Sequence, residues 1–163
     1  MTNDVTVRVA DSADAPAITV VINKAFHVAE NFFVEKDRLD LEEVYSLFEA
    51  GKFLLAEKND ALLGCVYIEP QLTTDTPRAY LGLLSVDPEH QQNGVGSKLM
   101  DAAEEYCRAL GCRLMDIRVV NLRTELPGYY QRRGYFETGI GQFPPEIETK
   151  VPCHFIEMSK SLE

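Results

Sequence analysis

The sequence has no long apolar run and no secretory leader pattern. No stretch approaches the roughly 20 apolar residues that a membrane-spanning helix needs. The first residues carry no basic segment followed by an apolar one. We therefore expect neither a membrane span nor a secretory signal.

Closely spaced cysteines are also missing. The four cysteines stand at positions 65, 107, 112 and 153, so no C-x-x-C pair occurs. This spacing argues against the common zinc and dithiol-redox motifs. Free thiols in a reducing compartment are the simplest interpretation, and we expect a cytoplasmic protein without a metal.

Positive charge is scarce. The chain has 16 Lys and Arg against 26 Asp and Glu, which gives a formal net charge of −10 at pH 7. Because a nucleic-acid-binding domain normally carries a basic face, this balance argues against such a partner. It mildly favours a cationic or neutral substrate, since negative potential concentrates cations near the surface.

What is present is the composition of one globular domain. Hydrophobic residues make up 45% of the 163 residues, which is ordinary for a chain with a packed core. No repeat, low-complexity tract or linker divides the sequence. We expect a single domain over residues 1–163.

Hydrophobic periodicity predicts strands interspersed with helices. Strands are expected at residues 5–9, 53–56, 61–69, 79–86, 114–120, 135–138 and 154–159, and helices at residues 11–26, 39–50, 95–110 and 125–133. Asn59 and Asp60 are expected to turn a hairpin between the second and third strands. Residues 79–86 are almost continuously apolar, which suits a central strand covered on both faces.

The sharpest local feature is a glycine-containing loop between a buried strand and an amphipathic helix. Gly94 and Gly96 stand where the helix begins. The first turn of a helix has unpaired N–H groups and a partial positive charge, and glycine lets an anion approach them. The loop is therefore a candidate pyrophosphate cradle. A plain turn that uses glycine for its backbone conformation is the alternative, whereas the nucleotide-triphosphate loop motif is absent.

Two signatures resemble the GNAT N-acetyltransferase superfamily. The segment Gln91-x-x-Gly94-x-Gly96 is similar to that family's Gln/Arg-x-x-Gly-x-Gly/Ala loop. Further along, Asn121 precedes a Tyr-x-x-x-Gly-aromatic turn at residues 130–135, which resembles the second signature. The order of elements resembles the family across nearly the whole chain.

The resemblance implies a fold and a reaction. The fold is a single α/β domain whose mixed sheet has six to seven mostly antiparallel strands, splayed in the middle and flanked by about four helices. The reaction moves an acetyl group from acetyl-coenzyme A to a primary amine of a small molecule, peptide or protein. A non-catalytic acyl-coenzyme A sensor and a plain phosphate-binding module are the alternatives. The acyl length, the acceptor and a homodimer are left open.

The resemblance also implies which residues bind the donor. Main-chain amides at residues 92–96, with Ser97, hold the pyrophosphate, and main-chain groups of Leu84 and Val86 pair with the pantetheine arm. Asn121 contacts the pantetheine, with a helix cap as its alternative role. The full implied set is Leu84, Ser85, Val86, Gln91, Gln92, Asn93, Gly94, Val95, Gly96, Ser97, Asn121 and Tyr130.

Tyr130 is the implied catalytic residue, beside the thioester sulfur. It has an alternative role as a core aromatic, and Pro127-Gly128 just before it could displace it. Since a tyrosine has a pKa near 10 and a thiol near 8.5, Tyr130 is expected to hydrogen-bond the leaving thiolate more readily than to protonate it.

The base that takes the amine proton is not identified. The candidates are Asp116, Glu137, Glu69, Tyr80 and His154. Acceptor selection is expected from the two N-terminal helices, their connection at residues 28–38 and the late loop at residues 141–152.

Overall fold

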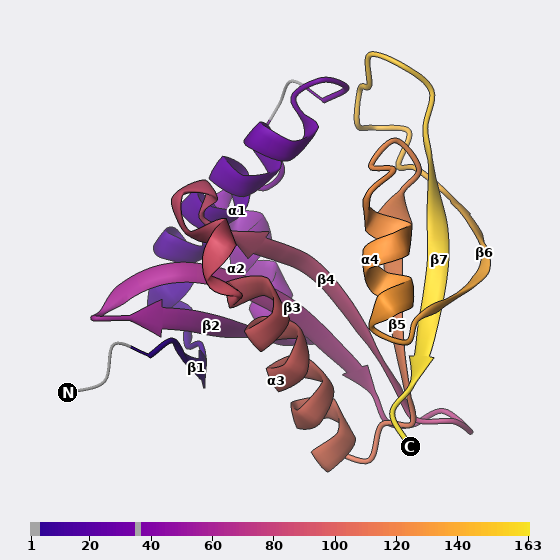
Figure 1. Ribbon diagram of the computed structural model, residues 1–163, viewed down its shortest axis with the longest axis horizontal. Coiled ribbons are helices and arrows are strands. Elements are labelled where there is room, and N and C mark those ends of the chain that lie inside the picture. Colours follow the sequence, from indigo (N-terminus) through magenta and orange to yellow (C-terminus); the bar gives the residue numbers. More distant parts are fainter. Residues whose placement is uncertain (1–3, 35–36) are drawn as a thin grey trace.

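One seven-stranded sheet organises the fold (Figure 1). The computed structural model describes residues 4–34 and 37–163, and the strands lie in the order β1-β2-β3-β4-β5-β7-β6. The strands are β1 Thr6–Val9, β2 Lys52–Lys58, β3 Ala61–Gln71, β4 Arg78–Val86, β5 Leu114–Val120, β6 Phe136–Gln142 and β7 His154–Ser161. The helices are α1 Ala15–Glu30, α2 Leu41–Ala50, α3 Val95–Ala109 and α4 Leu126–Arg132, with 3-10 turns η1 Ser12–Asp14 and η2 Pro88–Asn93. The predicted α/β fold class is confirmed.

Neighbouring strands are antiparallel throughout, except that β4 and β5 run parallel. That parallel ladder joins only residues 78–80 to residues 114–116. Beyond it the two strands diverge, as the wide angle between them shows in Figure 1. The expectation of a mostly antiparallel sheet splayed in the middle is confirmed.

An irregularity in β4 accompanies the divergence. The register between β3 and β4 shifts between the pairs Cys65–Ser85 and Tyr67–Gly82. Leu83 lies at this shift with a φ of 55°, a left-handed conformation that a leucine rarely adopts. Such a bulge bends a strand and increases its local twist. The bulge therefore gives β4 a physical reason to turn away from β5.

Helices cover both faces of the sheet. Helices α1 and α2 pack on one face, against Phe53, Leu55, Cys65 and Tyr67. Helices α3 and α4 pack on the other, in a cluster that includes strand residues 66, 68, 115 and 117. Successive side chains of a strand point to opposite faces, so the two-sided cover explains the nearly unbroken apolar run of β3. No helix within the described ranges is long and apolar enough to cross a membrane.

Capping residues set where the first two helices begin. Asp11 and Asp14 form a capping box ahead of α1, and Asp40 and Glu43 form another that starts α2 at Leu41, two residues later than expected. Each pair satisfies N–H groups that the first helical turn leaves unpaired. Helix α1 runs to Glu30, four residues beyond the predicted end.

The last two strands are longer than predicted. Strand β6 reaches Gln142 because its residues pair with β7 as far as His154. Its central sequence, Thr-Gly-Ile-Gly, does not predict a strand, because glycine is uncommon in strand interiors. The late loop therefore occupies residues 143–153 instead of 141–152.

Candidate active site

The loop after β4 leads directly into α3. Asp87 caps η2 by accepting a hydrogen bond from the Glu89 N–H at 3.0 Å. Gly94 then takes a left-handed conformation, with φ 70° and ψ 19°, and α3 begins at the next residue. Because this backbone region disfavours side chains, glycine is the residue that suits the position. The predicted strand–loop–helix unit is therefore present.

Within the described structure, the N–H groups at the start of α3 have no hydrogen-bond partner. The first hydrogen bond across this start runs from the Lys98 N–H to the Gly94 carbonyl at 3.1 Å, so the N–H groups at residues 95–97 precede the helical ladder. No side chain of the described residues caps this turn. These groups and the helix dipole together favour an anion.

Space around the two glycines is open. A Cβ atom at Gly94 would meet no atom within 4 Å, and one at Gly96 would meet only Val86 Cγ2, at 3.8 Å. Gly94 and Ser97 are exposed. The other implied residues of the loop, Gln91, Gln92 and Asn93, form the last part of η2. The unit fits a phosphate group, because an added Cβ at Gly94 or Gly96 would meet no backbone atom within 4 Å.

Strand β4 turns alternate main-chain groups toward β5. The Asp87 N–H donates to the Leu63 carbonyl of β3 at 2.7 Å. Because main-chain groups alternate along a strand, residue 85 faces β3 as well, whereas Leu84 and Val86 face the unpaired side. That orientation is the one expected for groups that pair with an extended ligand.

Ser85 supports the bulge. Its side chain is 1% exposed, and its hydroxyl donates to the Leu83 carbonyl at 2.9 Å. Ser85 is one of the implied donor-binding residues. It pairs with Cys65 of β3, so its main chain faces away from the unpaired edge of β4.

Asn121 joins the end of β5 to the start of β7. Its N–H donates to the His154 carbonyl at 2.9 Å, and its side-chain oxygen accepts from the His154 N–H at 2.8 Å. The alternative role as a helix cap is wrong, because the residue that precedes α4 is Glu125. The two bonds orient the side chain, and no hydrogen bond from its NH₂ group is found among the described residues.

Tyr130 is buried in α4. It is 7% exposed and packs edge-on against Tyr129 and Tyr135, with ring centroids 5.1 and 5.7 Å apart. Burial, aided by Tyr129, raises its pKa to about 12. Pro127 lies in the first turn of α4 and does not interrupt the helix. Tyr130 is thus a core aromatic, and no hydrogen bond to its hydroxyl is found in the described part of the chain.

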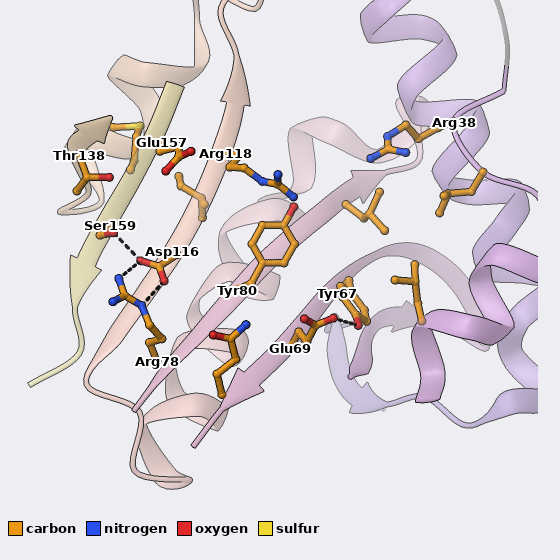
Figure 2. A pocket seen from close by; sticks show the side chains of 16 residues that line it. Arg38, Tyr67, Glu69, Arg78, Tyr80, Asp116, Arg118, Thr138, Glu157 and Ser159 are labelled. Carbon is orange, nitrogen blue, oxygen red and sulfur yellow. Dashed lines mark hydrogen bonds and ion pairs between the residues drawn. The ribbon is translucent and has the colours of Figure 1, made fainter. Parts of the chain in front are cut away.

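A cavity of about 610 Å³ opens on the α1/α2 face of the sheet (Figure 2). Its wall includes the bulge residue Leu83 and the nearby Tyr80, so it lies where β4 turns away from β5. Its charged lining residues are Arg38, Glu69, Arg78, Asp116, Arg118 and Glu157. Glu157 and Arg118 were not predicted, and the alternation of β7 and β5 places both on this face. Arg38 ends the connection that was expected to help select the acceptor.

Asp116 forms an ion pair with Arg78, where β4 and β5 still pair with each other. It accepts from Arg78 Nε and Nη2 at 2.6 and 2.8 Å, and from the Ser159 hydroxyl at 2.6 Å. Burial alone would raise its pKa, but the hydrogen bonds from Arg78 and Ser159 hold the pKa below its usual range. Asp116 is therefore a poor base, and its bonds tie β4, β5 and β7 together.

Of the other four base candidates, two line the cavity and two do not. Glu69 and Tyr80 line it, and Glu69 accepts from the Tyr67 hydroxyl at 2.7 Å. Burial and this hydrogen bond raise the pKa of Tyr67, which keeps it a donor. Glu137 and His154 are not among the lining residues. Glu69 and the unpredicted Glu157 are the two carboxylates of the cavity lining that have no cationic partner in the described structure.

The expected acceptor elements contribute unequally. Arg38, Leu39 and Leu47, from the end of the connection and from α2, line the cavity. Residues 35 and 36 of that connection lie outside the described residues. The late loop packs elsewhere, since the Lys150 N–H donates to the Phe33 carbonyl at 2.8 Å, and none of its residues lines the cavity.

The sequence matches a known family over most of its length. The family described as Acetyltransferase (GNAT) family matches residues 22–135. The chain belongs to the GNAT acetyltransferase family. Its resemblance to that family is therefore confirmed.

Two curated relatives illustrate the similarity. Mycothiol acetyltransferase of Saccharopolyspora erythraea is 34% identical over 124 residues, which cover 73% of this chain and 39% of that protein. "Probable N-acetyltransferase camello" of Xenopus tropicalis is 26% identical over 119 residues, which cover 73% of this chain and 54% of that protein. The chain thus spans about half the length, or less, of these relatives.

A solved structure supports the GNAT fold. The protein yncA of Salmonella typhimurium, solved with its cofactor acetyl-CoA, superposes with a TM-score of 0.74 at 22% sequence identity. The match covers 99% of this chain and 95% of that one. At this identity the likeness concerns the fold.

Proposed function

We propose that this GNAT protein transfers an acetyl group from acetyl-coenzyme A to the primary amine of an acceptor. One observation carries the proposal: the free start of α3 and the charged cavity lie at two ends of the same diverging segment of β4. A donor bound along that segment would have its pyrophosphate at the helix and its thioester at the cavity.

The donor would bind mainly through main-chain groups. The N–H groups at residues 95–97 would hold the pyrophosphate, because they precede the first hydrogen bond of α3. Gly94 and Gly96 have no side chains that could obstruct the approach of an anion. The main chain of Leu84 and Val86 would pair with the pantetheine arm. The Asn121 NH₂ group would contact the same arm from β5.

The reaction needs a neutral amine near the bulge. The amine attacks the thioester carbonyl, the carbon–sulfur bond breaks, and the amine proton passes to a base. Glu69 and Glu157 are the carboxylates available in the cavity. A main-chain N–H of the unpaired β4 edge would stabilise the negative charge on the carbonyl oxygen.

Tyr130 would stabilise the leaving thiolate by a hydrogen bond. With a pKa of about 12 against roughly 8.5 for a thiol, full proton transfer from tyrosine to thiolate would cost roughly 5 kcal/mol. Burial therefore strengthens the expectation that the tyrosine donates a hydrogen bond and keeps its proton.

The test is thiol release from acetyl-coenzyme A with a panel of amines. Release that depends on a particular amine supports the proposal. Tight binding of acetyl-coenzyme A without release for every amine would favour the acyl-coenzyme A sensor. Equal calorimetric affinity for acetyl-coenzyme A, phosphate and ATP would instead favour a plain phosphate-binding module.

A further inference from the structure

The charge inside the cavity differs from that of the whole chain. The lining residues include three arginines and three carboxylates, so their formal charges cancel, whereas the chain carries −10. Arginine is thus concentrated in the cavity relative to the surface. The expectation of a cationic or neutral substrate came from the net charge of the whole chain, whereas the cavity lining carries no net formal charge.

Two of the arginines form no salt bridge within the described residues. Arg78 is paired with Asp116. No ion pair to Arg38 or Arg118 is found among residues 4–34 and 37–163, and both side chains point into the cavity in Figure 2. Glu157 lies directly opposite Arg118 in the β5–β7 ladder, yet no salt bridge joins them in the described structure.

Two aromatic rings hold Arg118 in place. Its guanidinium carbon lies 5.1 Å from the centroid of the Tyr80 ring and 5.1 Å from that of Phe155. Phe155 in turn packs against Phe143 of the late loop, at 5.1 Å. Rings on which a guanidinium stacks fix its plane while its N–H groups remain free to bind a carboxylate. Arg118 is therefore prepared for an anion.

The position of Arg118 relates that anion to the reacting amine. Tyr80, on which Arg118 stacks, is three residues before the bulge at Leu83, and both line the cavity. We propose that the acceptor is a small amino-acid-like molecule whose carboxylate binds Arg118 while its amine lies at the bulge, near Glu69 and Glu157. This inference rests on the proposed acetyl transfer and specifies its acceptor class. A polyamine would meet Arg38 and Arg118 with like charge.

The experiment compares amines that differ only in the carboxylate. L-amino acids with apolar, polar and acidic side chains are assayed for thiol release beside their carboxamides and decarboxylated amines. The variants are Arg118→Gln, Arg118→Lys and, as a matched control, Arg113→Gln, which removes an exposed arginine paired with Glu163. The carboxamide is the stricter comparison, because its amine is less basic and more often neutral.

We expect the free acid to exceed its carboxamide by about tenfold to a hundredfold in kcat/KM, as for one hydrogen bond to a charged group. Arg118→Gln should abolish this preference, Arg118→Lys should keep part of it, and Arg113→Gln should leave it unchanged. Calorimetry without coenzyme A should show the same preference for an N-acetyl amino acid over its amide.

Two results would overturn the inference. One is equal or better turnover of the decarboxylated amines with no effect of Arg118→Gln. The other is equal affinity for the N-acetyl amino acid and its amide. If no amine releases thiol, the acetyl-transfer proposal fails, while the binding comparison still decides whether the cavity selects a carboxylate.

Discussion

Replacing Gly94 by aspartate should strongly weaken coenzyme A binding while the fold persists. The position is exposed, and a Cβ there would meet no protein atom within 4 Å. The new carboxylate would therefore occupy the place in front of the α3 N–H groups. The prediction tests whether that place is the pyrophosphate site.

The size of the effect follows from the charges. Two unit charges 5 Å apart interact by about 3 kcal/mol at an effective dielectric constant of about 20, and salt reduces this value at an exposed site. We expect Kd for coenzyme A to rise about 100-fold, measured by calorimetry at low and high salt. The loss should shrink at high salt.

Gly111→Asp is the matched control. Gly111 is also left-handed, with φ 99°, is also open to a Cβ, and follows the opposite end of α3. Both variants add one negative charge and place a side chain in a backbone region that costs roughly 1–2 kcal/mol. The reasoning is refuted if folded Gly94→Asp binds coenzyme A like the wild type, or if Gly111→Asp loses as much affinity.

Two further substitutions test the other parts of the site. Tyr130→Phe should lower kcat about tenfold, as one charge-assisted hydrogen bond is lost, with Kd for coenzyme A unchanged; an unaltered kcat would leave Tyr130 only its core role. Asp116→Asn should lower the free energy of unfolding by about 1 kcal/mol in urea titrations near neutral pH, since its ion pair with Arg78 is partly exposed. Because the folded-state pKa of Asp116 is lowered, this contribution is present above its ordinary pKa of about 3.9 and is lost as pH falls through the folded value. A difference between wild type and variant that grows with acidity would contradict the assignment.

Local signals in the sequence predicted most of the elements. The hairpin turn at Asn59 and Asp60 is one example: both residues have positive φ, at 53° and 65°, as a two-residue hairpin turn requires. The apolar stripe of α3 and the glycines before it are another. These features depend on neighbours in sequence, so periodicity and turn chemistry suffice to find them.

Non-local pairing limited what could be predicted of the site. Strand β7 lies between β5 and β6, and nothing in residues 154–159 indicates which strands flank them. That pairing is what brings Ser159 to Asp116 and Glu157 opposite Arg118. Asp116 was accordingly a candidate base until its two partners were located, and Glu157 was missed.

The bulge at Leu83 is a second feature without a sequence signal. A leucine with positive φ follows no propensity rule, and the surrounding apolar residues suggested a regular central strand. Without the bulge, β4 could continue beside β5, and the main-chain groups of Leu84 and Val86 would be satisfied within the sheet. The sequence pattern alone therefore predicts continuous pairing of β4 with β5 at the place where the candidate site lies.

The bulge and the Arg78–Asp116 pair together set how β4 diverges from β5. The ion pair ties β4 to β5 beside their three-residue parallel ladder, while the bulge turns β4 away a few residues later. The same turn that frees the β4 main chain also exposes Tyr80 and Leu83 to the cavity. In the proposed reaction, a donor that pairs with the freed edge and an acceptor held by Arg118 would thus meet at residues 80–84. The meeting point is set by backbone geometry, so the acceptor side chains around it can change without moving the thioester.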